Sequence, residues 1–87
     1  MAKVYIPAAW RDLSHGQTMV EVDGASLRQI IAALDARFAG LAERAIENDQ
    51  VAAGVAVSID GAITARGLLA PVRPDSEIHF LPAIGGG

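Results

Sequence analysis

The sequence of 87 residues contains no cysteine. Disulfides, thiolate metal sites, iron–sulfur clusters and cysteine nucleophiles are therefore all excluded, and packing alone must hold the fold. Any sulfur chemistry in which the chain takes part must use sulfur delivered from outside. Histidine is also scarce. There are two, His15 and His79, and neither stands at metal-ligand spacing from a pair of carboxylates, so we expect no metal site.

Basic charge and long apolar runs are lacking as well. Seven lysine and arginine residues are scattered along the chain against ten acidic residues, which gives a net charge of −3. Because a nucleic-acid-binding protein usually carries a basic stripe, we expect neither nucleic acid nor an anionic membrane as a partner. No segment reaches the roughly 18 apolar residues of a membrane-spanning helix, and no signal peptide precedes Trp10. We therefore expect a cytoplasmic protein.

Enough apolar sequence is present for one small domain. Hydrophobic residues make up 52% of the chain and charged residues 20%, a balance typical of a globular fold. No serine stands in the context of a nucleophile elbow or a triad. The acidic residues Glu43, Glu47 and Asp49 are interpreted as a solvated face, since nothing indicates a general acid and base held in a pocket.

The clearest element is an amphipathic helix that starts after Ser26. Ser26 followed by Gln29 three residues later is a capping-box pattern. A single apolar stripe at helical spacing then follows, formed by Leu27, Ile30, Ile31, Leu34 and Phe38. Gly40 is the expected helix stop.

Alternating apolar residues predict strands around this helix. They cover residues 3–7, 18–22, 55–59, 63–64 and 77–81. Asp60-Gly61 is a strong tight-turn signal between two of them. One helix can cover one face of such a sheet, so we predict a two-layer α+β domain with a mixed sheet of four to five strands packed on one main helix. With the last strand beside the first, in the middle of the sheet, this is the ubiquitin-like β-grasp.

The connecting segments are predicted more coarsely. Residues 41–48 have some helical character, and residues 48–50 are expected to form a loop. Trp10 or Leu13 is expected to tuck under the core. Residues 66–75 are expected to form a loop. Three of its side chains should pack down, namely Leu68, Leu69 and Val72.

The last seven residues form the most suggestive stretch, Leu81-Pro82-Ala83-Ile84-Gly85-Gly86-Gly87. Proline ends the strand pairing and glycine has the widest choice of backbone angles, so we divide the chain into a domain over 1–81 and a flexible tail over 82–87. The six residues after Leu81 reach roughly 20 Å when extended, enough for a terminal carboxylate to enter another protein's active site. A merely frayed end is the alternative.

Leu81 stands out within the last strand. By alternation, Ile78 and Phe80 point inward, whereas Leu81 points away from the helix-covered face. An exposed leucine beside Ala83 and Ile84 would extend an apolar patch along the exit of the tail, which suits a docking surface.

Several motifs resemble a known family. Residues 3–8 and Arg11-Asp12-Leu13 resemble the start of the small, MoaD-type subunit of molybdopterin synthase. Residues 55–61, 74–78 and 80–87 resemble the second half of the MoaD/ThiS sulfur carriers. Residues 40–44 and 81–84 are similar to carriers that supply a cysteine synthase. In two departures, Asp60 stands where many relatives have asparagine and Gly85 where alanine, serine or threonine is usual.

The resemblance implies a sulfur carrier, which is a protein co-substrate and not an enzyme. A ubiquitin-activating-type adenylyltransferase would adenylate the carboxylate of Gly87, and sulfur would then displace AMP to leave a thiocarboxylate. ATP would be used by this partner, with no cofactor bound to the chain itself. Gly86 and Gly87 would pass a narrow channel. The residues that contact the partner would be Leu81, Pro82, Ala83, Ile84 and Gly85.

The sulfur acceptor stays open at this point. The opening motif favours the large subunit of molybdopterin synthase, and cysteine synthase, thiamine synthesis and other thio-metabolites are alternatives. Two other functions are also open. One is a ubiquitin-like modifier joined through Gly87 to a lysine, and the other is a non-covalent β-grasp binding module that would not need Gly86-Gly87. The oligomeric state is likewise open.

Overall fold

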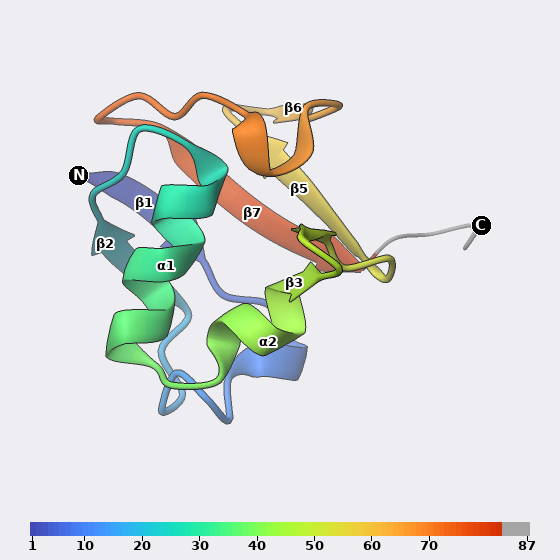
Figure 1. The fold of residues 1–87 in the computed structure, drawn as a ribbon. Coiled ribbons are helices and arrows are strands. Elements are labelled where there is room, and N and C mark those ends of the chain that lie inside the picture. The colour runs from blue at the N-terminus through green and yellow to red at the C-terminus, as the bar shows by residue number, and fades with distance from the viewer. Residues whose placement is uncertain (83–87) are drawn as a thin grey trace.

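A computed structural model describes residues 1–82 of the chain. Its central strand is the last one, β7 (Glu77–Pro82), which lies between β1 (Ala2–Tyr5) and β5 (Val55–Ile59), as Figure 1 shows. The outer strands are β2 (Met19–Val22) beside β1 and β6 (Ala62–Ile63) beside β5. β1 and β7 run parallel, and the other neighbours are antiparallel. The predicted mixed sheet, with the last strand beside the first, is confirmed.

The predicted helix is α1 (Leu27–Arg37), which begins at a capping box. The hydroxyl of Ser26 accepts a hydrogen bond from the N–H of Gln29 at 3.3 Å, and the Gln29 side chain accepts one from the N–H of Ala25 at 2.8 Å. The reciprocal bond thus reaches one residue before the N-cap. The N–H groups of Ala25 and Gln29, which have no acceptor within the helix, each gain a hydrogen-bond partner in this way.

The short helix α2 (Leu41–Ala45) is held by the end of α1. One carboxylate oxygen of Asp35 accepts hydrogen bonds from the N–H groups of Gly40 at 3.1 Å and Ala42 at 3.0 Å. Gly40 has a φ of +95°, a left-handed conformation that glycine adopts without steric cost. It therefore turns the chain between the two helices, as its predicted role as a helix stop requires.

A two-stranded hairpin replaces the loop predicted at residues 48–50. It consists of β3 (Ile46–Glu47) and β4 (Gln50–Val51), and the turn residues Asn48 and Asp49 have φ values of 53° and 60°. Two successive left-handed residues match the type I′ turn, whose twist suits antiparallel strands. The helical character expected up to residue 48 ends at Ala45 for this reason.

The core lies between the sheet and α1, with α2 at its edge (Figure 1). The stripe on α1 and its continuation at Phe38 are buried as predicted, and Ile78 and Phe80 face them from β7. Two short 3₁₀ helices close the ends of this core, η1 (Ala8–Trp10) and η2 (Gly67–Leu69). The fold is the predicted ubiquitin-like β-grasp.

The loop around η2 differs from the prediction at one residue. Leu68 and Val72 are buried, but the side chain of Leu69 is 74% exposed. The 3₁₀ turn places only one of the two adjacent leucines toward the core, and the small residue Ala70 packs inward instead. The expectation that Leu69 packs down is wrong.

The turn at Asp60-Gly61 ties β5 to the start of β7. The carboxylate of Asp60 accepts hydrogen bonds from the N–H of Glu77 at 2.9 Å and from the hydroxyl of Ser76 at 2.8 Å. These bonds, first of all the one from Glu77, hold the pKa of Asp60 below its ordinary value, with a smaller contribution from Arg73. Asp60 is thus both a turn residue and an anchor for the central strand.

Candidate functional site

The end of β7 is the last part of the chain that the structure describes. Phe80 is 3% exposed and Leu81 is 40% exposed, which confirms that Leu81 points out of the core. Pro82, assigned to the tail from sequence, is the last residue of β7 and lies opposite Val55. Because Asp60 N–H donates to the carbonyl of Glu77, the alternation of antiparallel pairs puts Pro82 at a position without a ladder bond to β5. Proline, which has no N–H, therefore removes no hydrogen bond from the pairing of β7 with β5.

An apolar cavity of about 330 Å³ opens beside this strand end, and we call it the tail-exit groove. Three segments far apart in the sequence line it: Pro7 to Trp10, Gly54 with Val55, and Phe80 to Pro82. Its lining combines the outward Leu81 with the inward Phe80. The groove therefore lies across the end of the sheet, beside the last described residue, rather than on the middle of the outer face.

The wall formed by η1 rests on an aromatic contact. Trp10 is 6% exposed, and its ring packs against Phe80 with the centroids 5.1 Å apart and the planes tilted by 47°. A tilted arrangement at this separation is favourable for two aromatic rings. Of the two residues expected to tuck under the core, Trp10 is buried and Leu13 is partly buried against it.

Arg44 of α2 holds the same wall from outside the groove. Its guanidinium donates to both carboxylate oxygens of Asp12, each at 2.9 Å, and to the carbonyl of Ala9 at 3.0 Å. The hydrogen bond from Arg44 lowers the pKa of Asp12, and the same contact raises the pKa of Arg44. The planar fork of arginine suits such a two-pronged contact with a carboxylate.

The other residues predicted to act lie beyond the part of the chain that the structure describes. These are Ala83, Ile84, Gly85, Gly86 and Gly87. Of the predicted partner contacts, only Leu81 and Pro82 have a described position, and both line the tail-exit groove.

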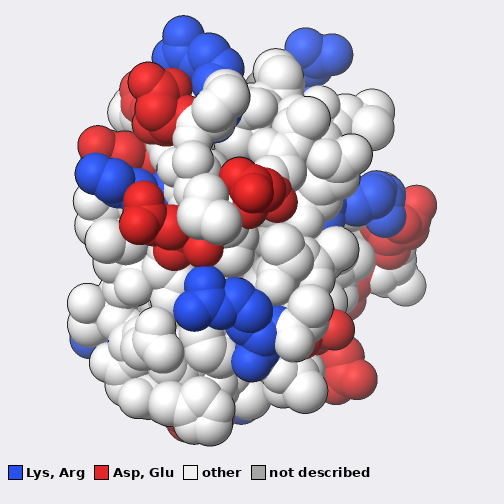
Figure 2. All heavy atoms as spheres, turned by 90° about the vertical axis from the view of Figure 1, so that its left-hand side faces the viewer, with Lys and Arg blue, Asp and Glu red and all other residues white. Residues whose placement is uncertain are grey.

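The middle of the outer sheet face is more polar than the groove. Tyr5 of β1 and His79 of β7 are paired neighbours whose rings stack 4.3 Å apart at an interplanar angle of 3°. Beside them stand the charged side chains of Lys3 and Glu77, which are also paired across the two strands. On the adjoining side of the molecule, formed by β2 and α1, charges of both signs are interspersed (Figure 2).

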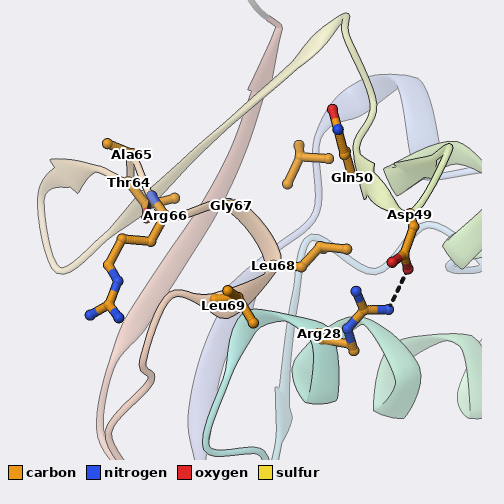
Figure 3. Close-up of a pocket in the computed structure, with 10 residues that line it drawn as sticks. Arg28, Asp49, Gln50, Thr64, Ala65, Arg66, Gly67, Leu68 and Leu69 are labelled. Carbon is orange, nitrogen blue, oxygen red and sulfur yellow. Dashed lines mark hydrogen bonds and ion pairs between the residues drawn. The ribbon is translucent and has the colours of Figure 1, made fainter.

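A larger cavity, of about 620 Å³, lies between β4, η2 and the start of α1. Arg28 faces it but is engaged by the carboxylate of Asp49 at 2.9 Å. Figure 3 shows the Arg66 side chain on the far side of the loop from this ion pair. The two arginines do not converge on a common point, so the cavity lacks the geometry of an anion site.

The described residues contain neither a cluster of metal ligands nor a membrane-spanning helix. Within residues 1–82, no three His, Asp or Glu side chains cluster closely enough to hold a metal ion. None of the described helices is long and apolar enough to cross a membrane.

Sequence reasoning found only part of this site. It identified Leu81 and Pro82, but not Gly54, not the exposed residues of η1, and not the role of Arg44. The sequence predicts no contact between Arg11-Asp12-Leu13 and residues 40–44, although both motifs resemble parts of a known family. An oppositely charged pair placed in those two motifs, Asp12 and Arg44, is the signal that could have indicated a contact between them.

Comparison with known proteins decides the family. The model of the ThiS family matches residues 4–87. The chain belongs to the ThiS family. Its members are small carrier proteins of ubiquitin-like fold rather than catalysts. No curated protein matches the sequence.

Several solved structures resemble this family member over nearly its whole length. A chain of the BexX/CysO complex from Amycolatopsis orientalis is 28% identical, with a TM-score of 0.92 and coverage of 100% of both chains. CysO of Mycobacterium tuberculosis is 24% identical with a TM-score of 0.89, covering 97% of this chain and 100% of its own. Small archaeal modifier protein 1 from Methanosarcina acetivorans is 20% identical with a TM-score of 0.78, covering 99% and 95%. The last two show the likeness of fold.

Proposed function

We propose that this ThiS-family protein is a sulfur carrier whose Gly87 carboxylate is converted to a thiocarboxylate by partner enzymes. The observation that carries the proposal is the family match, which extends through the final glycines to residue 87. The tail-exit groove supports it, because an apolar recess beside the end of β7 gives a partner a surface to grip while it acts on the terminus.

The chemistry needs an activating partner because a carboxylate is unreactive toward sulfur nucleophiles. A ubiquitin-activating-type adenylyltransferase joins the Gly87 carboxylate to AMP and releases pyrophosphate from ATP. Hydrosulfide then attacks the acyl carbon and expels AMP, which leaves the thiocarboxylate. A persulfide sulfur serves equally if a thiol afterwards reduces the acyl disulfide. The absence of cysteine from the chain agrees with a sulfur that arrives from outside.

Leu81 is the described residue on which docking should depend. It is 40% exposed and lies at the rim of the groove, next to the first residue of the tail. A partner that covers this rim would bury Leu81 together with Pro82. Ala83, Ile84 and Gly85 then extend the contact toward the active site, and the two final glycines enter it.

Two resemblances bear on the acceptor of the sulfur, and they favour different enzymes. The opening motif favours molybdopterin synthesis. The 28% identity to a chain of the BexX/CysO complex favours the other candidate, an enzyme of cysteine synthesis, which residues 40–44 and 81–84 also indicate. Sulfur transfer to each candidate enzyme, measured side by side from the same thiocarboxylate preparation, distinguishes the two.

Intact mass spectrometry tests the carrier function. After incubation with an activating enzyme from the same genome, ATP and sulfide, the mass should increase by the replacement of one oxygen by sulfur. Deletion of Gly86-Gly87 should abolish the increase. No shift with any such enzyme would refute the carrier function, whereas conjugates that survive a denaturing gel would instead support a protein modifier.

The docking surface has a separate test with a matched control. Leu81→Glu should raise the KM of the activating enzyme for this protein by on the order of tenfold or more, since a charge would have to be buried in an apolar contact. Ile63→Glu places the same charge at a leucine-sized side chain that is 62% exposed on β6, away from the groove, and should leave KM unchanged. Equal effects of the two changes would refute docking at the groove.

A further inference from the structure

The η1 wall of the tail-exit groove has few ties to the rest of the fold. Among the described residues, the backbone hydrogen bonds of residues 8–13 stay within residues 7–17, from Trp10 N–H to the Pro7 carbonyl through to Gly16 N–H to the Arg11 carbonyl. No strand of the sheet pairs with this segment. Its position therefore depends on the packing of Trp10 and Leu13 against the core and on the side chains that reach it from elsewhere.

Arg44 is the side chain that reaches it. Its guanidinium donates three hydrogen bonds, one to Ala9 and two to Asp12, which lie 35 and 32 residues before it in the sequence. Among the described residues, these are the hydrogen bonds that connect residues 8–13 to a helix. Ala9 itself lines the groove, whereas Arg44 does not. Arg44 thus acts on the groove from behind its wall.

The base of Arg44 is itself fixed. Asp35 of α1 caps the first turn of α2 through the N–H groups of Gly40 and Ala42, and Leu41 and Ala45 are buried in the core. A continuous set of contacts therefore runs from the buried helix α1 through α2 to η1. An arginine fork with two carboxylate oxygens and a carbonyl as acceptors defines one orientation of its target more closely than a lysine, which is a single point charge.

We propose that Arg44 is a positioning residue for partner docking: by clamping Ala9 and Asp12 it holds the η1 wall of the tail-exit groove in its binding-competent place. This inference rests on the proposed function, in which a partner grips the groove. The ion pair is exposed, with 40% of the Arg44 side chain and 62% of the Asp12 side chain accessible. An exposed pair of this kind adds little to overall stability, so its expected effect is on docking rather than on folding.

The test uses the chain's single tryptophan, Trp10, as a reporter in the wall itself. Arg44→Ala should make Trp10 easier to quench with acrylamide in the free protein, because the wall loses its outer tie. It should also raise the KM of the activating enzyme by on the order of two- to tenfold, the cost of ordering one loosened side chain on binding, with kcat unchanged. Arg44→Lys should fall between the wild type and Arg44→Ala in both measurements.

Arg28→Ala is the matched control. Arg28 forms an ion pair with Asp49 at the same 2.9 Å separation, with 48% of its side chain exposed, but it lines the other cavity. This variant should leave both Trp10 quenching and KM at their wild-type values. If it raises KM as much as Arg44→Ala does, the effect is one of general charge and the proposal is wrong.

Failure of the inference and failure of the proposed function give different results. If the wild type is adenylated and Arg44→Ala shows an unchanged KM, the clamp has no part in docking and the inference is overturned. If no activating enzyme acts on the wild type, the proposed function fails. In that case Trp10 quenching alone tests whether Arg44 holds the η1 wall in place. Equal quenching in the wild type and Arg44→Ala overturns the inference.

Discussion

Replacing Ile31 by alanine should lower the free energy of unfolding by about 2–4 kcal/mol, whereas the same change at Ile63 should alter it by less than about 0.5 kcal/mol. The two positions differ in burial: Ile31 on α1 is fully buried, and Ile63 on β6 is 62% exposed. The change removes three carbon atoms, each contributing about 0.8 kcal/mol when buried, or about 2.4 kcal/mol in transfer free energy. A residual cavity adds to this loss, and the higher helix propensity of alanine subtracts a few tenths of a kcal/mol.

Urea unfolding, followed by Trp10 fluorescence and by far-UV circular dichroism, measures both variants. A domain of 87 residues has a stability of about 4–13 kcal/mol, so the expected loss at Ile31 is a large fraction of the total. The midpoint should fall at Ile31→Ala with an unchanged m-value. Equal losses at the two positions would refute the reasoning, because they would show that α1 does not cover the sheet with this face.

Two further predictions concern backbone anchors. Asp60→Asn should destabilise the fold by about 1 kcal/mol near pH 7, since the bonds from Glu77 and Ser76 lose a charged acceptor. Because folding lowers the pKa of Asp60, its contribution is full above the ordinary value of 3.8 and is lost as pH falls through the lower folded-state pKa. Wild type and variant should therefore converge in acid, and a difference that stays constant as the pH is lowered until the wild type unfolds would contradict this cause. Gly24→Ala should cost about 1–3 kcal/mol, because a Cβ there would lie 2.9 Å from the backbone nitrogen of Ile30. Gly54→Ala, where a Cβ would meet nothing within 4 Å, is its control, and equal thermal midpoints of the two variants would refute the clash.

The sequence predicts those elements best whose signals are local or periodic. The cap at Ser26 and the stripe that follows it specify α1 almost to the residue, because capping and side-chain spacing act within a few turns. The central place of β7 is predicted from the order of strands and helix, in which the last strand most simply lies beside the first. Asp60-Gly61 is recognised as a turn, but its carboxylate contacts with the start of β7 are tertiary and leave no local pattern.

The elements that sequence reasoning missed lack such signals. Strands of two residues, as in β3 and β4, are too short to show alternation, although Asn48 and Asp49 are residue types that tolerate the left-handed conformation their turn needs. Leu69 carries the same hydrophobicity as its neighbour Leu68, and only the direction of the 3₁₀ turn decides which of them is buried.

The tail-exit groove could not be foreseen as a whole. It is assembled from three segments whose proximity depends on sheet order and on the packing of Trp10 against Phe80. Sequence alone could supply Leu81 and Pro82 because they begin the short stretch that ends in the three glycines. It could not supply Gly54, which has no side chain to signal a function.

The central position of β7 has a mechanical consequence. Traction on the residues after Pro82 is transmitted along β7, which is bonded on one side to β1 and on the other to β5. Interstrand hydrogen bonds lie across the strand direction, so such a pull loads both rows in shear, all at once, instead of peeling an edge strand one bond at a time. The domain therefore resists a pull on its last strand more strongly than it would if that strand lay at the edge of the sheet. The sheet serves as an anchor for its own last residues.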